Sequence, residues 1–224
     1  MKLGVLFSGG KDSCYALYKA RKEHDIVCLI TMASDNPDSY MFHTPNIDLT
    51  KLQAEALNIP LLFGKTKGEK EKELKDLKDL IRKAKTEYKL QGIVTGAIRS
   101  EYQASRIQKI CDELKLECIN PLWHKDQVEL LKELLQNKFE VIITRVAAYP
   151  FDETLLGKKI DEAVIKKLVD LQQKYQINPS GEGGEIETFV TNMPLFKKRI
   201  EIKKSSIKYS KNEGSFTIEN AELK

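Results

Sequence analysis

Apolar runs and helical repeats alternate along roughly the first half of the chain. Compact apolar runs bounded by glycine, proline or polar residues predict buried strands, whereas apolar residues spaced three or four apart predict helices. By these criteria, strands are expected at 3–7, 25–34, 59–66, 92–98 and 116–123, and helices at 12–23, 46–58, 68–89 and 100–115.

This alternation predicts an α/β fold with a Rossmann-like parallel sheet and helices on both of its faces. In sheets of this kind, ligands bind beyond the carboxyl ends of the strands, near the point where the strand order reverses. The loops that follow the strands are therefore where candidate chemistry should be sought.

The pattern changes after residue 124, and the last third of the chain alternates apolar and polar residues as antiparallel strands do. A turn is expected at residues 212–214. We therefore predict a nucleotide-binding domain at 1–124 and a smaller α+β substrate-binding subdomain at 125–224. The elements expected in the subdomain are helices at 125–137 and 160–174, a strand at 139–146, a polar loop at 177–185, and the strands "EIETFVT", "RIEIKKSSIKYS" and "SFTIEN".

Composition narrows the class of protein without identifying it. Hydrophobic residues make up 41% and charged residues 31% of the 224 residues, which is typical of a globular protein. The net charge of +4 is too small to indicate nucleic-acid binding by itself. No apolar stretch approaches the roughly 20 residues that cross a bilayer, and no signal-peptide pattern follows the first apolar run. The four cysteines form no Cys-x-x-Cys pair, so we expect buried thiols and a cytoplasmic location.

The stretch "SGGKDS", residues 8–13, joins the first predicted strand to the first helix. Glycines let backbone N–H groups approach a phosphate, and a helix N-terminus adds a favourable partial charge. The Walker pattern does not fit, because Val5 stands where its first glycine belongs. The dinucleotide fingerprint does not fit either, because its glycines are separated by other residues, whereas Gly9 and Gly10 are adjacent. A capped turn is the structural alternative. All six residues together favour a phosphate site, where Asp12 would serve a Mg²⁺ ion.

This loop resembles the SGGxDS loop of the PP-loop ATP pyrophosphatases. Further stretches, "SYMFHTPN", "GAIRSEYQASRIQKICDELKLECINPLW" and "GEGGEIETFVTNMPLF", are similar to the diphthine–ammonia ligase (diphthamide synthase) branch of that family. The resemblance covers nearly the whole chain. One departure from it is Asn192, where the branch pattern leads us to expect an aspartate.

The resemblance implies a ligase that uses ATP and Mg²⁺ to amidate the carboxylate of diphthine on translation elongation factor two. An acyl-adenylate would form, ammonia would displace AMP, and pyrophosphate would be released. It implies no nucleic-acid or membrane partner, and a homo-oligomer is left open. No glutaminase segment with an N-terminal cysteine is seen, so free ammonia is the expected nitrogen source.

The resemblance also implies roles for particular residues. Lys11, Asp12, Glu182 and Glu185 are the catalytic candidates, with Asp12 also the candidate metal ligand. The nucleotide candidates are Ser8, Gly9, Gly10, Lys11, Asp12, Ser13, Gly96 and Arg106. The substrate candidates are Tyr40, His43, Ser100, Tyr102, Glu182, Glu185 and Glu187.

The roles of the three glutamates in "GEGGEIE" stay open at this point. They could attract the trimethylammonium group of diphthine, deprotonate ammonium or hold Mg²⁺, while aromatic rings such as Tyr40, Phe42, Tyr102 or Trp123 could surround the cation. A flexible acidic turn is the structural alternative. Our hypothesis places Glu182 and Glu185 opposite the 8–13 loop, across a cleft between the two subdomains.

Two other functions fit parts of the sequence. A PP-loop enzyme that modifies tRNA by thiolation or lysidine formation should carry a basic surface, and often additional cysteines, which the +4 charge and the cysteine spacing do not favour. A nucleotide-binding sensor without turnover would share the sheet but would not need the acidic segment.

Overall fold

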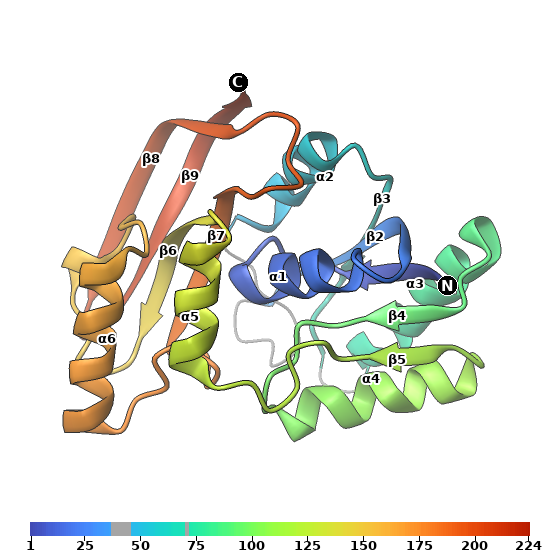
Figure 1. Cartoon of the computed structure of the whole chain (residues 1–224), viewed down its shortest axis with the longest axis horizontal. Helices are drawn as coiled ribbons and strands as arrows, with labels where there is room; N and C mark the ends of the chain where they lie inside the picture. Colours follow the sequence, from blue (N-terminus) through green and yellow to red (C-terminus); the bar gives the residue numbers. More distant parts are fainter. Residues whose placement is uncertain (37–45, 70–71) are drawn as a thin grey trace. The chain divides into compact units, whose positions relative to one another are not determined.

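The computed structural model describes residues 1–36, 46–69 and 72–224 (Figure 1). Contacts along the chain divide it into two compact units, Met1–Trp123 and His124–Lys224. Each unit has its own sheet, so each is described by itself.

The first unit contains a five-stranded sheet in the order β3-β2-β1-β4-β5. Every neighbouring pair in it is parallel, which confirms the α/β fold expected from the alternating pattern. The strands are β1 (Lys2–Leu6), β2 (Asp25–Ser34), β3 (Leu61–Thr66), β4 (Gly92–Val94) and β5 (Glu117–Ile119).

Helices cover both faces of this sheet. The strands and the helices α3 (Lys72–Tyr88) and α4 (Glu101–Glu113) share one apolar cluster, which includes Ile30, Ile81 and Ile107. Because crossovers between parallel strands are right-handed, the α1 and α2 connections lie on the opposite face. The helical elements of the unit are α1 (Lys11–Ala20), the 3₁₀ turn η1 (Ile47–Leu49), α2 (Thr50–Leu57), α3 (Lys72–Tyr88) and α4 (Glu101–Glu113).

The sequence explains both kinds of element in physical terms. Strand β2 is an almost unbroken apolar run whose last seven residues are all buried, as a central strand covered on both faces requires. In α3 the buried Leu77, Ile81 and Ala84 recur at helical spacing and leave a charged outer face.

Strands β4 and β5 are shorter than the apolar pattern predicts. The expected strands at 92–98 and 116–123 end at Val94 and Ile119. After Val94, only the N–H of Thr95 continues the ladder, to the carbonyl of Ile119 at 3.0 Å, and the N–H of Ala97 then turns back to the Thr95 hydroxyl at 3.2 Å. Beyond these ends, Ala97, Ile98 and Leu122 are buried in loops, so the hydrophobic pattern alone could not separate strand from loop.

The sheet has its topological switch point between β1 and β4. The chain leaves β1 toward one edge of the sheet and leaves β4 toward the other, so the loops after these two neighbouring strands diverge. Ligands of open α/β sheets bind at this point.

The second unit is built on an antiparallel sheet in the order β7-β6-β9-β8. This smaller sheet confirms the α+β character expected of the C-terminal region. Its strands are β6 (Glu140–Ala147), β7 (Ile186–Asn192), β8 (Ile200–Ser210) and β9 (Glu213–Leu223).

Two helices accompany this sheet. They are α5 (Gln127–Gln136) and α6 (Glu162–Tyr175), which pack side by side (Figure 1). A 3₁₀ turn, η2 (Glu153–Leu155), lies between β6 and α6. The Asp126 and Asp161 side chains cap the two helices by accepting backbone N–H bonds of 2.8 Å each.

The turn between β8 and β9 lies one residue earlier than predicted. Lys211 and Asn212 carry the positive φ angles of 51° and 69°, and Glu213 already pairs with Ser210 in the ladder. Gly214 therefore lies inside β9. A Cβ there would come within 2.7 Å of the Tyr209 ring, so the glycine serves close packing and not the turn.

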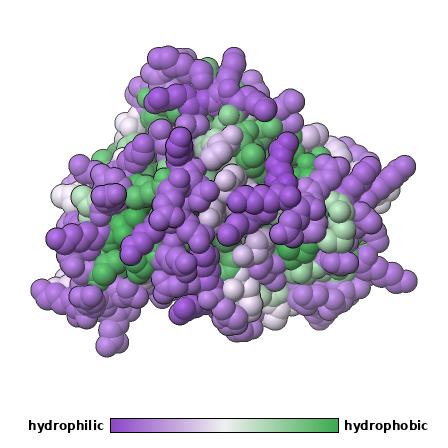
Figure 2. Space-filling model, viewed as in Figure 1, coloured by the Kyte–Doolittle hydropathy of each residue, from purple (hydrophilic) through white to green (hydrophobic). Residues whose placement is uncertain are grey.

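Polar side chains cover much of the face shown in Figure 2, with smaller apolar areas between them. Within the described part of the chain, no helix combines the length and the apolar character that a membrane span requires.

The cluster beneath α3 and α4 gives a direct test of the first unit. We expect Ile81→Ala to lower the free energy of unfolding by about 2–5 kcal/mol, because Ile81 is fully buried and its removal leaves a cavity. The same change at Ile207, which is 43% exposed, should cost far less. Urea unfolding followed by circular dichroism measures both, and equal losses would contradict the packing described here.

Candidate active site

The loop between β1 and α1 carries the "SGGKDS" stretch and lies at the switch point of the sheet. Gly9 has φ of 76°, a conformation that favours glycine. Gly10 is extended and directly precedes α1, and no side chain caps the helix there. The first N–H groups of a helix have no partner within it, so this helix start offers donors to an anion.

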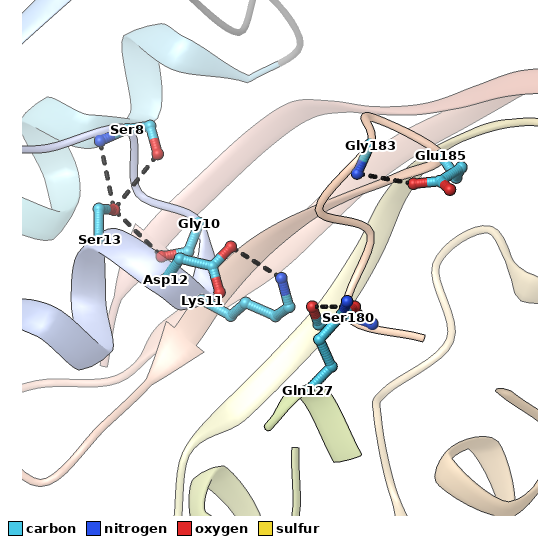
Figure 3. Close-up of polar contacts among 9 residues, drawn as sticks. All are labelled: Ser8, Gly10, Lys11, Asp12, Ser13, Gln127, Ser180, Gly183 and Glu185. Atoms are coloured by element: carbon cyan, nitrogen blue, oxygen red, sulfur yellow. Dashed lines mark hydrogen bonds and ion pairs between the residues drawn. The ribbon is translucent and has the colours of Figure 1, made fainter. Parts of the chain in front are cut away.

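Two serine hydroxyls hold the loop closed (Figure 3). The Ser13 hydroxyl accepts from the Ser8 N–H at 3.3 Å and lies 3.3 Å from the Ser8 hydroxyl. It also donates to the Gly10 carbonyl at 3.1 Å. The two serines of the motif therefore meet across the loop, which fixes the backbone around both glycines.

A buried glutamine supports the loop from α2. The Gln53 side chain is fully buried and its Nε2 donates to the Gly9 carbonyl at 2.9 Å. A Cβ on Gly9 would come within 2.2 Å of the Gln53 Oε1. The sequence does not point to Gln53, because a glutamine within a helical repeat gives no signal of a loop contact 44 residues away.

Gly96 lies against the same loop from the other side of the switch point. A Cβ on Gly96 would approach the Asp12 carbonyl carbon and the Ser13 nitrogen to 2.8 Å each. The prediction that Gly96 ends the fourth strand is wrong, since β4 ends at Val94. Its glycine instead permits the loop after β4 to touch the backbone at the start of α1.

Lys11 and Asp12 form an ion pair at the start of α1, with 2.8 Å between Nζ and Oδ2 (Figure 3). The Lys11 side chain is only 4% exposed. The other carboxylate oxygen of Asp12, Oδ1, is buried and has no hydrogen-bond partner among the described residues. An oxygen in this state fits a Mg²⁺ ligand.

The described side chains do not supply a complete set of metal ligands. Among the residues that the structure describes, no group of three or more His, Cys, Asp or Glu side chains is arranged to hold an ion. A Mg²⁺ ion at Asp12 would therefore depend on phosphate oxygens and water for its other ligands, as is usual for this ion.

The start of α4 gives structural contacts to three predicted site residues. The Ser100 hydroxyl caps the helix by accepting from the Gln103 N–H at 3.3 Å. The Arg106 guanidinium lies over the Tyr102 ring, 3.5 Å from its centre, and donates to the Tyr102 carbonyl at 3.4 Å. Arg106 and Tyr102 thus share a face, as their spacing predicts.

In the second unit, the acidic loop before β7 is held by internal contacts. Glu185 accepts from the Gly183 N–H at 2.8 Å (Figure 3) and from the Asn178 amide at 2.8 Å. The Glu187 carboxylate is 9% exposed and pairs with Arg145 at 3.2 Å. The structure shows these contacts within the second unit, and the hypothesis that Glu182 and Glu185 face the 8–13 loop stays a prediction.

The remaining candidates divide into two groups. Tyr40 and His43 lie outside the described residues. The nucleotide candidates from Ser8 to Ser13 span the loop after β1 and the first residues of α1, and Gly96 contacts them from the loop after β4. The glutamates lie in the other unit. Asn192 is the last residue of β7 and pairs with Glu140 of β6. Nothing in this pairing explains the aspartate that the branch pattern leads us to expect.

Cys14 follows the loop directly, yet it is no candidate nucleophile. Its side chain is fully buried, and burial raises the pKa of the thiol well above its ordinary value. The nucleophilic form of a cysteine is the thiolate, which this environment disfavours.

The sequence profile of the diphthamide synthase N-terminal domain matches residues 1–118, and that of the C-terminal domain matches residues 126–223. The chain belongs to the diphthamide synthase family. This membership confirms the family resemblance seen in the sequence motifs.

Relatives from several organisms are similar to this diphthamide synthase family member over most of its length. A Homo sapiens protein named diphthine–ammonia ligase is 35% identical over 230 residues, which is 92% of this chain and 85% of the relative. A Danio rerio protein of the same name is 36% identical and covers 90% of this chain and 86% of its own. The family is therefore one of ligases that form a carbon–nitrogen bond.

Two other proteins are similar to this chain over part of their length or only weakly in structure. A Schizosaccharomyces pombe relative of the same name is 36% identical over 95% of this chain, but only 38% of that longer protein is covered. Among solved structures, a predicted subunit of tRNA methyltransferase from Methanocaldococcus jannaschii covers 87% of this chain and 98% of its own, with 16% identity and a TM-score of 0.40. That structural likeness is too low to carry an argument.

Gln53 provides the test of the loop in this family member. We expect Gln53→Ala to destabilise the protein by about 1–3 kcal/mol, because the buried Gly9 carbonyl loses its donor. The matched control is Gln108→Ala on the exposed side of α4, which should change stability by less than about 0.5 kcal/mol. Urea unfolding measures both, and a Gln53→Ala variant as stable as the wild type would show that the contact does not support the loop.

Proposed function

We propose that this chain catalyses the ATP-dependent amidation of the diphthine carboxylate on translation elongation factor two. Membership of a family of diphthine–ammonia ligases supports the reaction. The single structural observation that supports the use of ATP is the glycine loop at the switch point, with its helix start open toward an anion.

The chemistry needs two displacements, because a carboxylate has no good leaving group. First, a carboxylate oxygen attacks the α-phosphorus of ATP, the bond from that phosphorus to the bridging oxygen breaks, and pyrophosphate leaves. Ammonia then attacks the carbonyl carbon of the acyl-adenylate. The bond to the AMP oxygen breaks, and the extra proton on nitrogen is lost, which leaves the amide.

The 8–13 loop and the start of α1 serve the first displacement. Negative charge develops on the departing pyrophosphate, and the backbone N–H groups at the helix start stabilise it most when they are already fixed in place. The Ser8–Ser13 contact and the Gln53 bond supply that rigidity. The buried Lys11 adds positive charge next to these donors.

Asp12 is the group in this loop that would hold Mg²⁺, through the buried Oδ1 that lacks a hydrogen-bond partner among the described residues. When bound, Mg²⁺ supplies charge neutralisation on the phosphate oxygens. Lys11 holds the second oxygen of Asp12 at 2.8 Å and so fixes the direction in which the carboxylate faces.

The second unit is the proposed substrate-binding part. Diphthine carries a trimethylammonium group beside its reacting carboxylate, and carboxylates and aromatic faces both attract such a cation. The loop with Glu182 and Glu185 is the proposed acidic part of the substrate site, and Tyr102 with Ser100 the proposed part on the first unit. Arg106 is proposed to contact the nucleotide, and a cytoplasmic location stays a prediction.

Isotope transfer tests the order of bond breaking. When the diphthine carboxylate of the elongation factor is labelled with ¹⁸O, we expect one labelled oxygen to appear in AMP and none in pyrophosphate, because the substrate oxygen bonds to the α-phosphorus. Mass spectrometry of the products measures this. Release of ADP and phosphate would refute the proposed function, and so would turnover that depends on tRNA.

Two variants accompany this experiment. We expect Asp12→Asn to lower kcat by about 10²–10³, the range found when one preorganised charge-stabilising group is removed. Lys83→Ala, on the exposed face of α3, is the control and should leave the rate unchanged. Normal turnover by Asp12→Asn would remove Asp12 from the proposed chemistry.

A further inference from the structure

Side chains that have no part in the proposed reaction hold the acidic loop of the second unit, residues 177–185. Gln127, at the start of α5, is only 6% exposed. Its Oε1 accepts from the Ser180 N–H at 3.1 Å and from the Ser180 hydroxyl at 2.8 Å (Figure 3). A glutamine 53 residues earlier in the chain thus binds the beginning of the "SGEGGE" loop.

The contacts continue from Gln127 to the other end of the loop. The Gln127 Nε2 donates to the Asn178 Oδ1 at 3.1 Å, and the Asn178 Nδ2 donates to the Glu185 Oε1 at 2.8 Å. The second oxygen of Glu185, Oε2, accepts from the Gly183 N–H at 2.8 Å. We call the three side chains Gln127, Asn178 and Glu185 the amide relay.

The direction of every bond in the relay is fixed by its two ends. Ser180 presents a backbone N–H, which only an oxygen can accept, so the Gln127 Oε1 must face it. Glu185 presents carboxylate oxygens, so the Asn178 NH₂ group must face them. The two amides between these ends can then adopt one orientation only, which makes the relay specific to these residue types.

Backbone hydrogen bonds within the loop also define its shape. The Gly181 N–H donates to the Asn178 carbonyl at 2.8 Å, and the Gly184 N–H donates to the Gly181 carbonyl at 3.0 Å. Both glycines have positive φ, 75° and 83°. The Glu185 carbonyl also accepts from the Ala147 N–H at 2.9 Å, which ties the loop to the end of β6.

We infer that Gln127 and Asn178 are positioning residues that hold the acidic loop in its working shape, and that Glu185 acts as their anchor instead of reacting with substrate. This inference rests on the proposed function of the loop. The geometry supports it because both Glu185 oxygens already accept hydrogen bonds from inside the loop, one at each side of the carboxylate.

One consequence is that Glu185→Gln alone cannot identify a catalytic carboxylate. A glutamine at 185 would place its NH₂ group against either the Gly183 N–H or the Asn178 NH₂ group, so two donors would face each other whichever way it turned. The loop would lose its shape, and activity would fall, even where the carboxylate at 185 takes no part in the reaction.

Exchanging the two partners separates these roles. In the double variant Asn178→Asp with Glu185→Gln, a carboxylate at 178 accepts from Gln127 and from the new amide at 185, whose oxygen still accepts from Gly183. The loop charge is unchanged, and only the long contact of 3.4 Å from the backbone N–H of residue 178 is lost. Each single change leaves a donor–donor or carboxylate–carboxylate clash, which the double variant removes.

The experiment compares kcat and KM for the diphthine-bearing elongation factor, and KM for ATP, in these three variants. We expect each single variant to lose at least about tenfold in kcat/KM for the protein substrate, and the double variant to recover at least about tenfold, a coupling within the range seen for contacting pairs. KM for ATP should stay near the wild-type value throughout. A double variant as inactive as Glu185→Gln would overturn the inference and assign the carboxylate at 185 to the reaction.

Gln127→Ala completes the test, with Gln173→Ala on the exposed side of α6 as its matched control. Hydrogen exchange measures the loop directly. In Gln127→Ala the amides of residues 178 and 180–185 should exchange about five- to tenfold faster, the effect of losing roughly one net hydrogen bond, while β6 exchanges as in the wild type. Unchanged exchange in the loop would overturn the inference.

The exchange measurement also keeps the two proposals apart. A wild-type protein that amidates no diphthine would refute the proposed function. Hydrogen exchange would then test the inference about the relay by itself. Faster loop exchange in Gln127→Ala, together with loop protection in the double variant above that of either single variant, would support it. Loop protection in the double variant as low as in the single variants would refute it.

Discussion

The close approach of two backbones at the switch point is the constraint on which the candidate site depends. Gly96 brings the loop after β4 against Asp12 and Ser13, where any larger residue would bring its Cβ to within 2.8 Å of the backbone. This contact joins the loops of two neighbouring strands, and it fixes the start of α1 relative to the sheet. The phosphate donors of the proposed site are held in place by the fold itself, so no reorganisation is needed when charge develops.

A common device supports both loops that the proposal uses. In the first unit, the buried Gln53 from α2 holds the Gly9 carbonyl, and in the second unit the buried Gln127 from α5 holds Ser180. A glutamine offers a donor NH₂ group and an acceptor carbonyl oxygen on a single planar amide, so it can satisfy loop backbone without adding a charge. Glycine-rich loops gain the freedom to adopt positive φ at a cost in order, and these glutamines restore that order.

The sequence predicted the fold better than it predicted the details of the site. Alternating patterns identified the parallel sheet, and the six residues from Ser8 to Ser13 identified the glycine loop. The ends of β4 and β5 could not be predicted, because buried loop residues are as apolar as strand residues. Gln53, Gln127 and Asn178 could not be found either, since each acts on a partner that only the folded chain brings near. Glu185 shows the same limit, because a carboxylate in a glycine-rich stretch can serve substrate or structure, and only its partners tell which.

The most direct test is to follow the backbone amide signals of the protein by nuclear magnetic resonance while a non-hydrolysable ATP analogue is added with Mg²⁺. If the glycine loop and its glycine neighbour hold the triphosphate, the signals of residues 8–13 and of Gly96 should shift most and together, in proportion to the bound fraction. Binding that shifts other parts of the chain and leaves these signals in place would contradict the account.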